Sequence, residues 1–103
     1  MTGVQTCALP IYIGFLFRRD EATSTRIART LAAQAPELTI GMNQPYQVDD
    51  ASDWFVPRIG EARGLCHSLI EIRNDHIRSS TGQALWADRL SHGLRPLILE
   101  HLT

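Results

Sequence analysis

The sequence predicts an α/β domain in which a mostly parallel sheet is flanked by helices. Three short apolar segments, at 12–17, 38–41 and 67–73, have the length and the β-branched or aromatic content of buried strands. The stretches between and after them carry helical periodicity or helix-starting residues, so the expected order is β-α-β-α-β-α. A chain of 103 residues that is 44% hydrophobic forms one domain at most, with a modest core.

The first strand and the first helix follow directly from the local pattern. The strand "YIGFLF" at 12–17 is ended by the charged run "RRDE". A helix is expected from about Asp20, whose side chain suits the N-cap position. Its apolar positions recur at helical spacing until a proline interrupts them, and these positions are Ile27, Leu31 and Ala35.

The middle of the chain is expected to hold two further strands and a short helix. "LTIG" at 38–41 is the second strand, and "MNQPYQVDDAS" after it is rich in turn formers and polar side chains, as functional loops are. Pro57 opens a short helix that runs to about Arg63. "HSLIEIR" at 67–73 is the third strand.

The last element is a helix that begins after "NDHIRSSTG". Gly93 and Pro96 are expected to weaken or kink it, because glycine is flexible and proline lacks an amide donor. The two tryptophans, Trp54 and Trp86, are expected to be packing anchors. The apolar stripe of this helix is formed by Trp86, Leu90, Leu94 and Ile98.

The first eleven residues, "MTGVQTCALPI", resemble the translation of a common sequencing-library adapter. Such a segment is excluded from fold analysis, so we expect the domain to comprise residues 12–103 and to be a fragment that has lost its true start. The competing interpretation is the apolar centre of a signal peptide. A signal peptide has basic residues before its apolar run, whereas here Arg18 and Arg19 follow it.

Composition excludes several function classes. All ten basic residues are arginine, and with eleven acidic residues they give a net charge of -1, so a nucleic-acid surface is not expected. The apolar run at 7–17 is too short to cross a bilayer as a helix, so no membrane span is expected. Outside the adapter-like segment Cys66 is the single cysteine, which favours a reducing, cytoplasmic location.

The stretch "GLCHSLIEIRNDHI" at 64–77 places Glu71 and Arg73 at the end of an apolar strand. Side chains alternate along a strand, so both share one face, about 6–7 Å apart. Ligands of open α/β sheets collect beyond the carboxyl ends of parallel strands, where we expect both residues to lie. A carboxylate there suits a general base, and an arginine suits a substrate carboxylate. Spacing alone somewhat favours the alternative, an ion pair at the sheet edge.

A resemblance to a known family adds to this interpretation. Five segments, in order, resemble the carboxyl-terminal part of the N-formylglutamate amidohydrolase family and together cover residue 12 to about 99. They are "IGFLFRRD", "IGMNQPY", "SDWFVPRIGEARGL", "HSLIEIRNDHI" and "GQALWADRL". More distantly, "SDW", a Gly-Leu step and "EIRND" are similar to segments of zinc carboxypeptidases, in which the corresponding glutamate is the general base.

The resemblance implies a zinc-dependent hydrolase with a zinc-carboxypeptidase-like fold, also described as phosphorylase/hydrolase-like. Its substrate is implied to be a small N-acyl amino acid, cleaved at the N-formyl or a related amide of an acidic amino acid, with Glu71 as the base. The family's zinc ligands lie in its amino-terminal half. The four histidines of this chain show no recognised zinc spacing, so no metal ligand is assigned and the fragment alone is expected to be inactive.

Three substrate-binding residues are predicted: Arg73, Arg58 and Tyr46. The evidence for Arg58 is even between binding a substrate carboxylate and pairing with Glu61 or Asp53 at the surface, whereas Arg63 is expected to pair at the surface. Tyr46 follows a proline in the family-like "NQPY" loop, although loop aromatics often simply pack down.

Some positions depart from the family or have a simpler structural explanation. Family members commonly have an acidic residue at Met42, histidine at Ile59 and proline at Cys66, and the change at Ile59 puts activity in doubt. His67 and Cys66 are expected to be packed residues. A second function class therefore stays open, a catalytically silent α/β module or pseudoenzyme that binds another chain. In either case an incomplete sheet is expected to self-associate.

Overall fold

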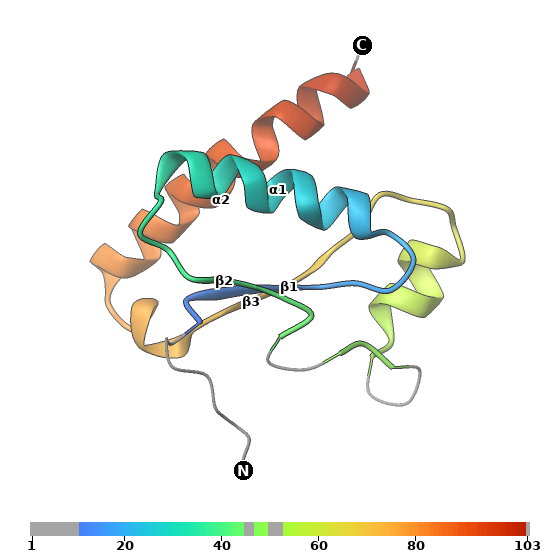
Figure 1. Ribbon diagram of the computed structural model, residues 1–103, viewed down its shortest axis with the longest axis horizontal. Helices are drawn as coiled ribbons and strands as arrows, with labels where there is room; N and C mark the ends of the chain where they lie inside the picture. The colour runs from blue at the N-terminus through green and yellow to red at the C-terminus, as the bar shows by residue number, and fades with distance from the viewer. Residues whose placement is uncertain (1–10, 45–46, 50–52, 103) are drawn as a thin grey trace.

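The computed structural model describes residues 11–44, 47–49 and 53–102, which form one sheet with two helices on the same side of it (Figure 1). The sheet has three strands in the order β2-β1-β3, so β1 is central. The elements are β1 (Ile13–Leu16), α1 (Glu21–Gln34), β2 (Ile40–Met42), a short π-helical segment η1 (Val56–Glu61), β3 (Leu69–Ile72), a 3-10 turn η2 (Asn74–His76) and α2 (Ser80–Leu102).

The α/β class is confirmed, but the prediction of a mostly parallel sheet is wrong for the third strand. β1 and β2 are parallel, with Ile13 opposite Ile40. β3 runs antiparallel to β1, with Leu69 opposite Leu16 and Ile72 opposite Ile13. The sheet is therefore mixed, with one parallel pair and one antiparallel pair.

The connection before β3 explains this difference. A parallel strand requires a crossover that returns the chain to the starting edge of the sheet, usually along a helix. The helix expected from Pro57 is only the six-residue η1, which spans about 9 Å at 1.5 Å per residue. Its Val56 packs against Leu16 at the carboxyl end of β1, so the chain is still at that edge when β3 begins. From there β3 can only run back along β1.

The core lies between the sheet and the two helices. Ile13 and Phe15 of β1 are fully buried against Ile27 and Leu31 of α1 and Trp86 of α2. We call the opposite side of the sheet the outer face, because neither helix packs there. A smaller cluster covers one end of the outer face and consists of Leu16, Val48, Val56 and Leu69.

Helix α1 begins and ends as its sequence predicts. The Asp20 side chain caps it by accepting a hydrogen bond from the Thr23 amide, and Ala35 follows its last residue, directly before Pro36. The cap satisfies one of the amides that the first turn of a helix leaves without an intrahelical partner. Ile27 and Leu31 are buried, which confirms the expected apolar face.

Helix α2 runs from Ser80 to Leu102 through both Gly93 and Pro96. Gly93 is buried, and a β-carbon added to it would lie 3.4 Å from Leu31 of α1. The glycine therefore lies where α1 and α2 pack closely, a role that helical periodicity does not reveal. Within the described residues, no helix is both long and apolar enough to cross a membrane.

Three packing predictions are wrong, and one of them is Ile98, which is expected in the apolar stripe of α2 but is 53% exposed. Trp86 is 2% exposed, as expected of an anchor, but Trp54 is 63% exposed. Cys66 is exposed rather than a core residue, whereas His67 beside it is buried as expected. The errors at Trp54 and Cys66 fall in the segment between β2 and β3, which does not pack across the sheet as a helix would.

The contact at Gly93 leads to a stability prediction. Gly93→Ala should stabilise the protein by about 0.5–1 kcal/mol, because alanine favours the helix and its β-carbon would be at ordinary contact distance from Leu31. Gly93→Leu should destabilise it by about 1–3 kcal/mol, since extra carbons would push the helices apart. Chemical denaturation monitored by circular dichroism measures both changes. Equal destabilisation by alanine and leucine would show that the helices already touch at this position.

Candidate functional site

Glu71, the predicted base, lies on β3 directly opposite Gly14 of β1. Its strand neighbours Ile70 and Ile72 pack toward the helices, so alternation puts the Glu71 side chain on the outer face of the sheet. The residue is partly buried. Because glycine has no side chain, the outer face beside the carboxylate carries no side chain from β1 at this register.

Arg73 follows β3, but its guanidinium pairs with Asp75. The Arg73 Nε lies 2.8 Å from the Asp75 Oδ1, and both side chains are about 40% exposed, at 40% and 42%. The Arg73 amide donates a hydrogen bond of 2.9 Å to the carbonyl of Tyr12, just before β1 begins. Arg73 thus remains two residues from Glu71, with its side chain oriented by a neighbouring carboxylate.

The predicted location of Glu71 and Arg73 relative to the parallel strands is wrong. Because β3 is antiparallel, its carboxyl end lies beside the amino ends of β1 and β2. The general tendency of ligands to bind beyond the carboxyl ends of parallel strands therefore does not support this pair. Its candidacy rests on the resemblance and on the partial exposure of Glu71 itself, since Gly14 opposite it is buried.

Of the other two predicted substrate residues, Arg58 is not brought to Arg73. Arg58 is exposed on η1, whose Val56 packs at the Leu16 end of β1. Arg73 lies at the opposite end, beside Tyr12, and the four residues of β1 between these ends span about 13 Å. Tyr46 lies outside the described residues.

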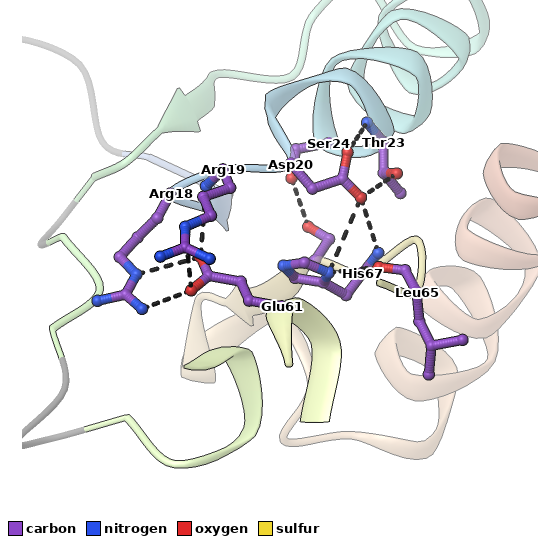
Figure 2. Close-up of polar contacts among 9 residues, drawn as sticks. Arg18, Arg19, Asp20, Thr23, Ser24, Glu61, Leu65 and His67 are labelled. Carbon is purple, nitrogen blue, oxygen red and sulfur yellow. Dashed lines mark hydrogen bonds and ion pairs between the residues drawn. The ribbon is translucent and has the colours of Figure 1, made fainter. Parts of the chain in front are cut away.

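A polar cluster that sequence analysis missed lies at the carboxyl end of β1 (Figure 2). Its first part is the Glu61 carboxylate, which receives hydrogen bonds of 3.2 Å from the Arg18 Nε and 2.5 Å from the Arg18 Nη2. The Arg19 amide lies 3.4 Å from the same carboxylate, whose side chain is 2% exposed. The Arg18 guanidinium, followed by the Arg19 amide, outweighs desolvation and lowers the pKa of Glu61. Glu61 thus binds the arginines after β1, and the expected pairing with Arg58 or Arg63 is not the one found here.

The second part of the cluster is Asp20, which joins helix α1 to the segment before β3. Its Oδ1 caps α1 by accepting a hydrogen bond from the Thr23 amide. Its Oδ2 accepts a 2.9 Å hydrogen bond from the His67 amide. Partial burial would raise the pKa of Asp20, but the hydrogen bonds from Thr23 and the His67 amide outweigh it, so the pKa is lowered. The adjacent Ser24 and Ser68 hydroxyls are 2.7 Å apart and add a second link between the same segments.

The His67 ring explains why residue 60 is glycine. The ring Nδ1 lies 2.6 Å from the Leu65 carbonyl oxygen, and the ring is packed against Gly60. A β-carbon on Gly60 would lie 2.4 Å from the ring carbon Cγ, closer than any side chain tolerates. The His67 ring therefore packs directly against Gly60. Together with the hydrogen bonds of Asp20 and Glu61, this contact joins the β1–α1 turn to η1 and to the connection between η1 and β3.

An open hollow of about 340 Å³ lies beside this cluster and is lined by Arg19, Asp20, Gly60, Glu61, Gly64, Leu65, Cys66 and His67. Both carboxylates already accept hydrogen bonds from neighbouring residues. We therefore interpret the cluster as a structural cross-link and not as the reacting group. One signal in the sequence could have identified it, namely the charged run "RRDE" placed directly after a buried strand.

Metal binding has no support in the part of the chain that the structure describes. There, no three side chains of histidine, cysteine, aspartate or glutamate come together in a group that could hold a metal ion. The zinc implied by the resemblance therefore does not fit these residues.

The lowered pKa values predict how stability depends on pH. The ordinary values are 3.8 for Asp20 and 4.5 for Glu61, and folding lowers both. Each group therefore contributes its full stabilisation above its ordinary pKa and loses it as the pH falls through the folded value. Urea denaturation should show stability falling below about pH 5, with a smaller slope in the double variant Asp20→Asn, Glu61→Gln. An unchanged slope in the double variant would contradict the assignment.

The His67 contact predicts the effect of filling the space at Gly60. Gly60→Ala should destabilise the protein by about 1–3 kcal/mol, because the new methyl group displaces the His67 ring. The neighbouring exposed substitution Ala62→Ser should change stability by less than about 0.5 kcal/mol. Thermal melts of the two variants measure the difference. A neutral Gly60→Ala would mean that the ring is not fixed against this glycine.

Comparisons with known proteins show a similarity to a solved structure. No family model and no curated protein matches the chain. The crystal structure of the gene product Atu2144 from Agrobacterium tumefaciens is similar in fold, with a TM-score of 0.62 and 28% sequence identity. The similarity covers 84% of this chain but 35% of that one, so the chain spans about a third of the length of the protein it matches.

Proposed function

We propose that this chain is the carboxyl-terminal part of a zinc-dependent amidohydrolase resembling N-formylglutamate amidohydrolase, with Glu71 as its general base. The observation that carries the proposal is the position of Glu71 on the outer face of the sheet, opposite Gly14, where neither helix covers it. A general base has to be reachable by water and substrate, and this face leaves Glu71 partly exposed. Five family-like segments in the same order support the same assignment.

The proposal includes a zinc-carboxypeptidase-like fold for the complete domain. The mixed sheet with helices on one side is compatible with it, and the similarity to about a third of a longer chain supports a larger domain. We also propose a cytoplasmic location, supported by the single cysteine outside the adapter-like segment.

The proposed reaction is hydrolysis of the N-formyl or a related N-acyl amide of an acidic amino acid. Glu71 takes a proton from the attacking water as the water oxygen bonds to the amide carbonyl carbon. The protonated Glu71 then gives that proton to the amine nitrogen as the carbon–nitrogen bond breaks, which releases the acid and the free amino acid. Arg73 is proposed to bind a substrate carboxylate, and the Asp75 contact orients its guanidinium.

No step of this proposal is assigned to zinc. The resemblance implies the metal, but the described residues offer no group that could hold it. The proposal therefore requires metal ligands from residues other than these, and it predicts that the chain alone hydrolyses no amide.

A second function is favoured by a separate observation. Trp54 and Phe55, beside η1, are 63% and 45% exposed, and aromatic side chains of this kind are enriched in protein interfaces. Ile59 stands where the family commonly has histidine. A catalytically silent module that binds another protein through this surface is the alternative.

The base is tested in an enzyme restored with the amino-terminal half of a relative. Glu71→Gln keeps the shape of the side chain but cannot accept a proton, so hydrolysis of N-formylglutamate should fall by roughly 10²-fold or more. Zinc content, measured by atomic absorption, should not change. Loss of zinc would make Glu71 a ligand, and full activity in the variant would leave the carboxylate with a structural role.

Arg73 is tested in the same restored enzyme. Arg73→Lys keeps the charge but loses the planar fork, so KM for N-formylglutamate should rise roughly tenfold with a smaller change in kcat. Arg63→Lys, at another exposed arginine, is the matched control and should leave KM unchanged. Equal KM values for the two variants would remove Arg73 from the substrate site.

A further inference from the structure

Strand β2 has a free edge whose hydrogen-bonding groups can be identified. The Tyr12 amide donates to the Thr39 carbonyl, and the Asn43 amide donates to the Phe15 carbonyl. Because groups alternate in direction along a strand, Thr39, Gly41 and Asn43 face β1, and the amides and carbonyls of Ile40 and Met42 face away from it. Among the strands that the structure describes, β2 is the last on its side of the sheet, so these four groups point outward.

A groove runs along this edge between β2 and helix α1. It has a volume of about 350 Å³ and is lined by Glu21, Thr25, Ala28, Arg29, Ala32, Ile40 and Met42. The helix contributes small side chains at the centre of the groove, which allows another helix to approach closely. Met42, on the helix side of the edge, is 37% exposed and adds apolar surface.

The groove carries one negative and one positive side chain, placed so that two copies of the groove related by a two-fold axis would bring opposite charges together. Glu21 and Arg29 are eight residues apart on α1, about 12 Å along the helix, with Thr25 midway between them. Neither side chain makes an ion pair among the residues that the structure describes. Around a two-fold axis near Thr25, each Glu21 faces the Arg29 of the other copy, so a single surface supplies both halves of each pair.

We propose that this edge binds a second copy of the chain, with the two β2 strands paired antiparallel and the two α1 helices side by side. In this register Ile40 pairs with the partner's Met42, and Met42 pairs with the partner's Ile40. All four outward groups of each copy are then hydrogen-bonded. Gly41 lies on the two-fold axis, and the two sheets join into one of six strands, which removes both β2 edges. This interface does not depend on the role of Glu71.

The test uses the full chain and measures its mass by sedimentation equilibrium across a range of concentrations. The wild-type chain should be a dimer at high concentration. Arg29→Glu should raise the dimer Kd roughly tenfold or more, because it turns two attractive pairs into two repulsive ones. The control Arg95→Glu reverses a charge on an exposed part of α2 and should leave Kd unchanged.

A mixing experiment separates this interface from a general effect of charge on folding. Arg29→Glu and Glu21→Arg should each dimerise weakly alone, whereas a one-to-one mixture should form a heterodimer in which both pairs are again attractive. Amide exchange in the wild-type dimer should slow at Ile40 and Met42.

Three results would overturn the proposal. One is a chain that stays monomeric at millimolar concentration. Another is a mixture of the two variants that dimerises no better than either variant alone. The third is a dimer whose amide protection appears at Ile70 and Ile72, since this would place the contact on the free edge of β3.

Discussion

The position of β3 depends on the carboxylate of Asp20. This group caps α1 through Thr23 and also accepts the hydrogen bond from the His67 amide, two residues before β3 begins. The start of the first helix is thereby fixed to the start of the last strand, at the carboxyl end of β1. With that end held, β3 runs back along β1, and Glu71 comes to lie opposite Gly14 on the outer face.

Most of the fold could be predicted from local patterns, because its elements begin and end at residues with clear conformational preferences. Asp20 starts α1, and the buried strand β1 follows from its apolar, β-branched composition. The direction of β3 could not be predicted in this way. It depends on whether the 26 residues between β2 and β3 cross the sheet, and Pro57 followed by helix-compatible residues indicates a helix without giving its length or course.

The candidate site was predictable in composition but not in arrangement. "LIEIRND" correctly indicates a strand that ends in charged residues, yet the partner of Arg73 is Asp75, two residues further along the chain. The cross-link between Arg18 and Glu61 joins residues 43 positions apart. Periodicity and spacing describe near neighbours, so long-range pairs of this kind become visible only when the topology is known.

The direction of β3 determines which face and which edge of the sheet carry Glu71. Nuclear Overhauser spectroscopy measures this direction directly. In an antiparallel pair the α-protons of opposite residues that do not exchange hydrogen bonds lie close together. An antiparallel β3 should show α-proton contacts between Phe15 and Ile70 and between Ile13 and Ile72. Absence of both contacts, together with the amide-to-α-proton pattern of a parallel β1–β3 pair, would contradict it.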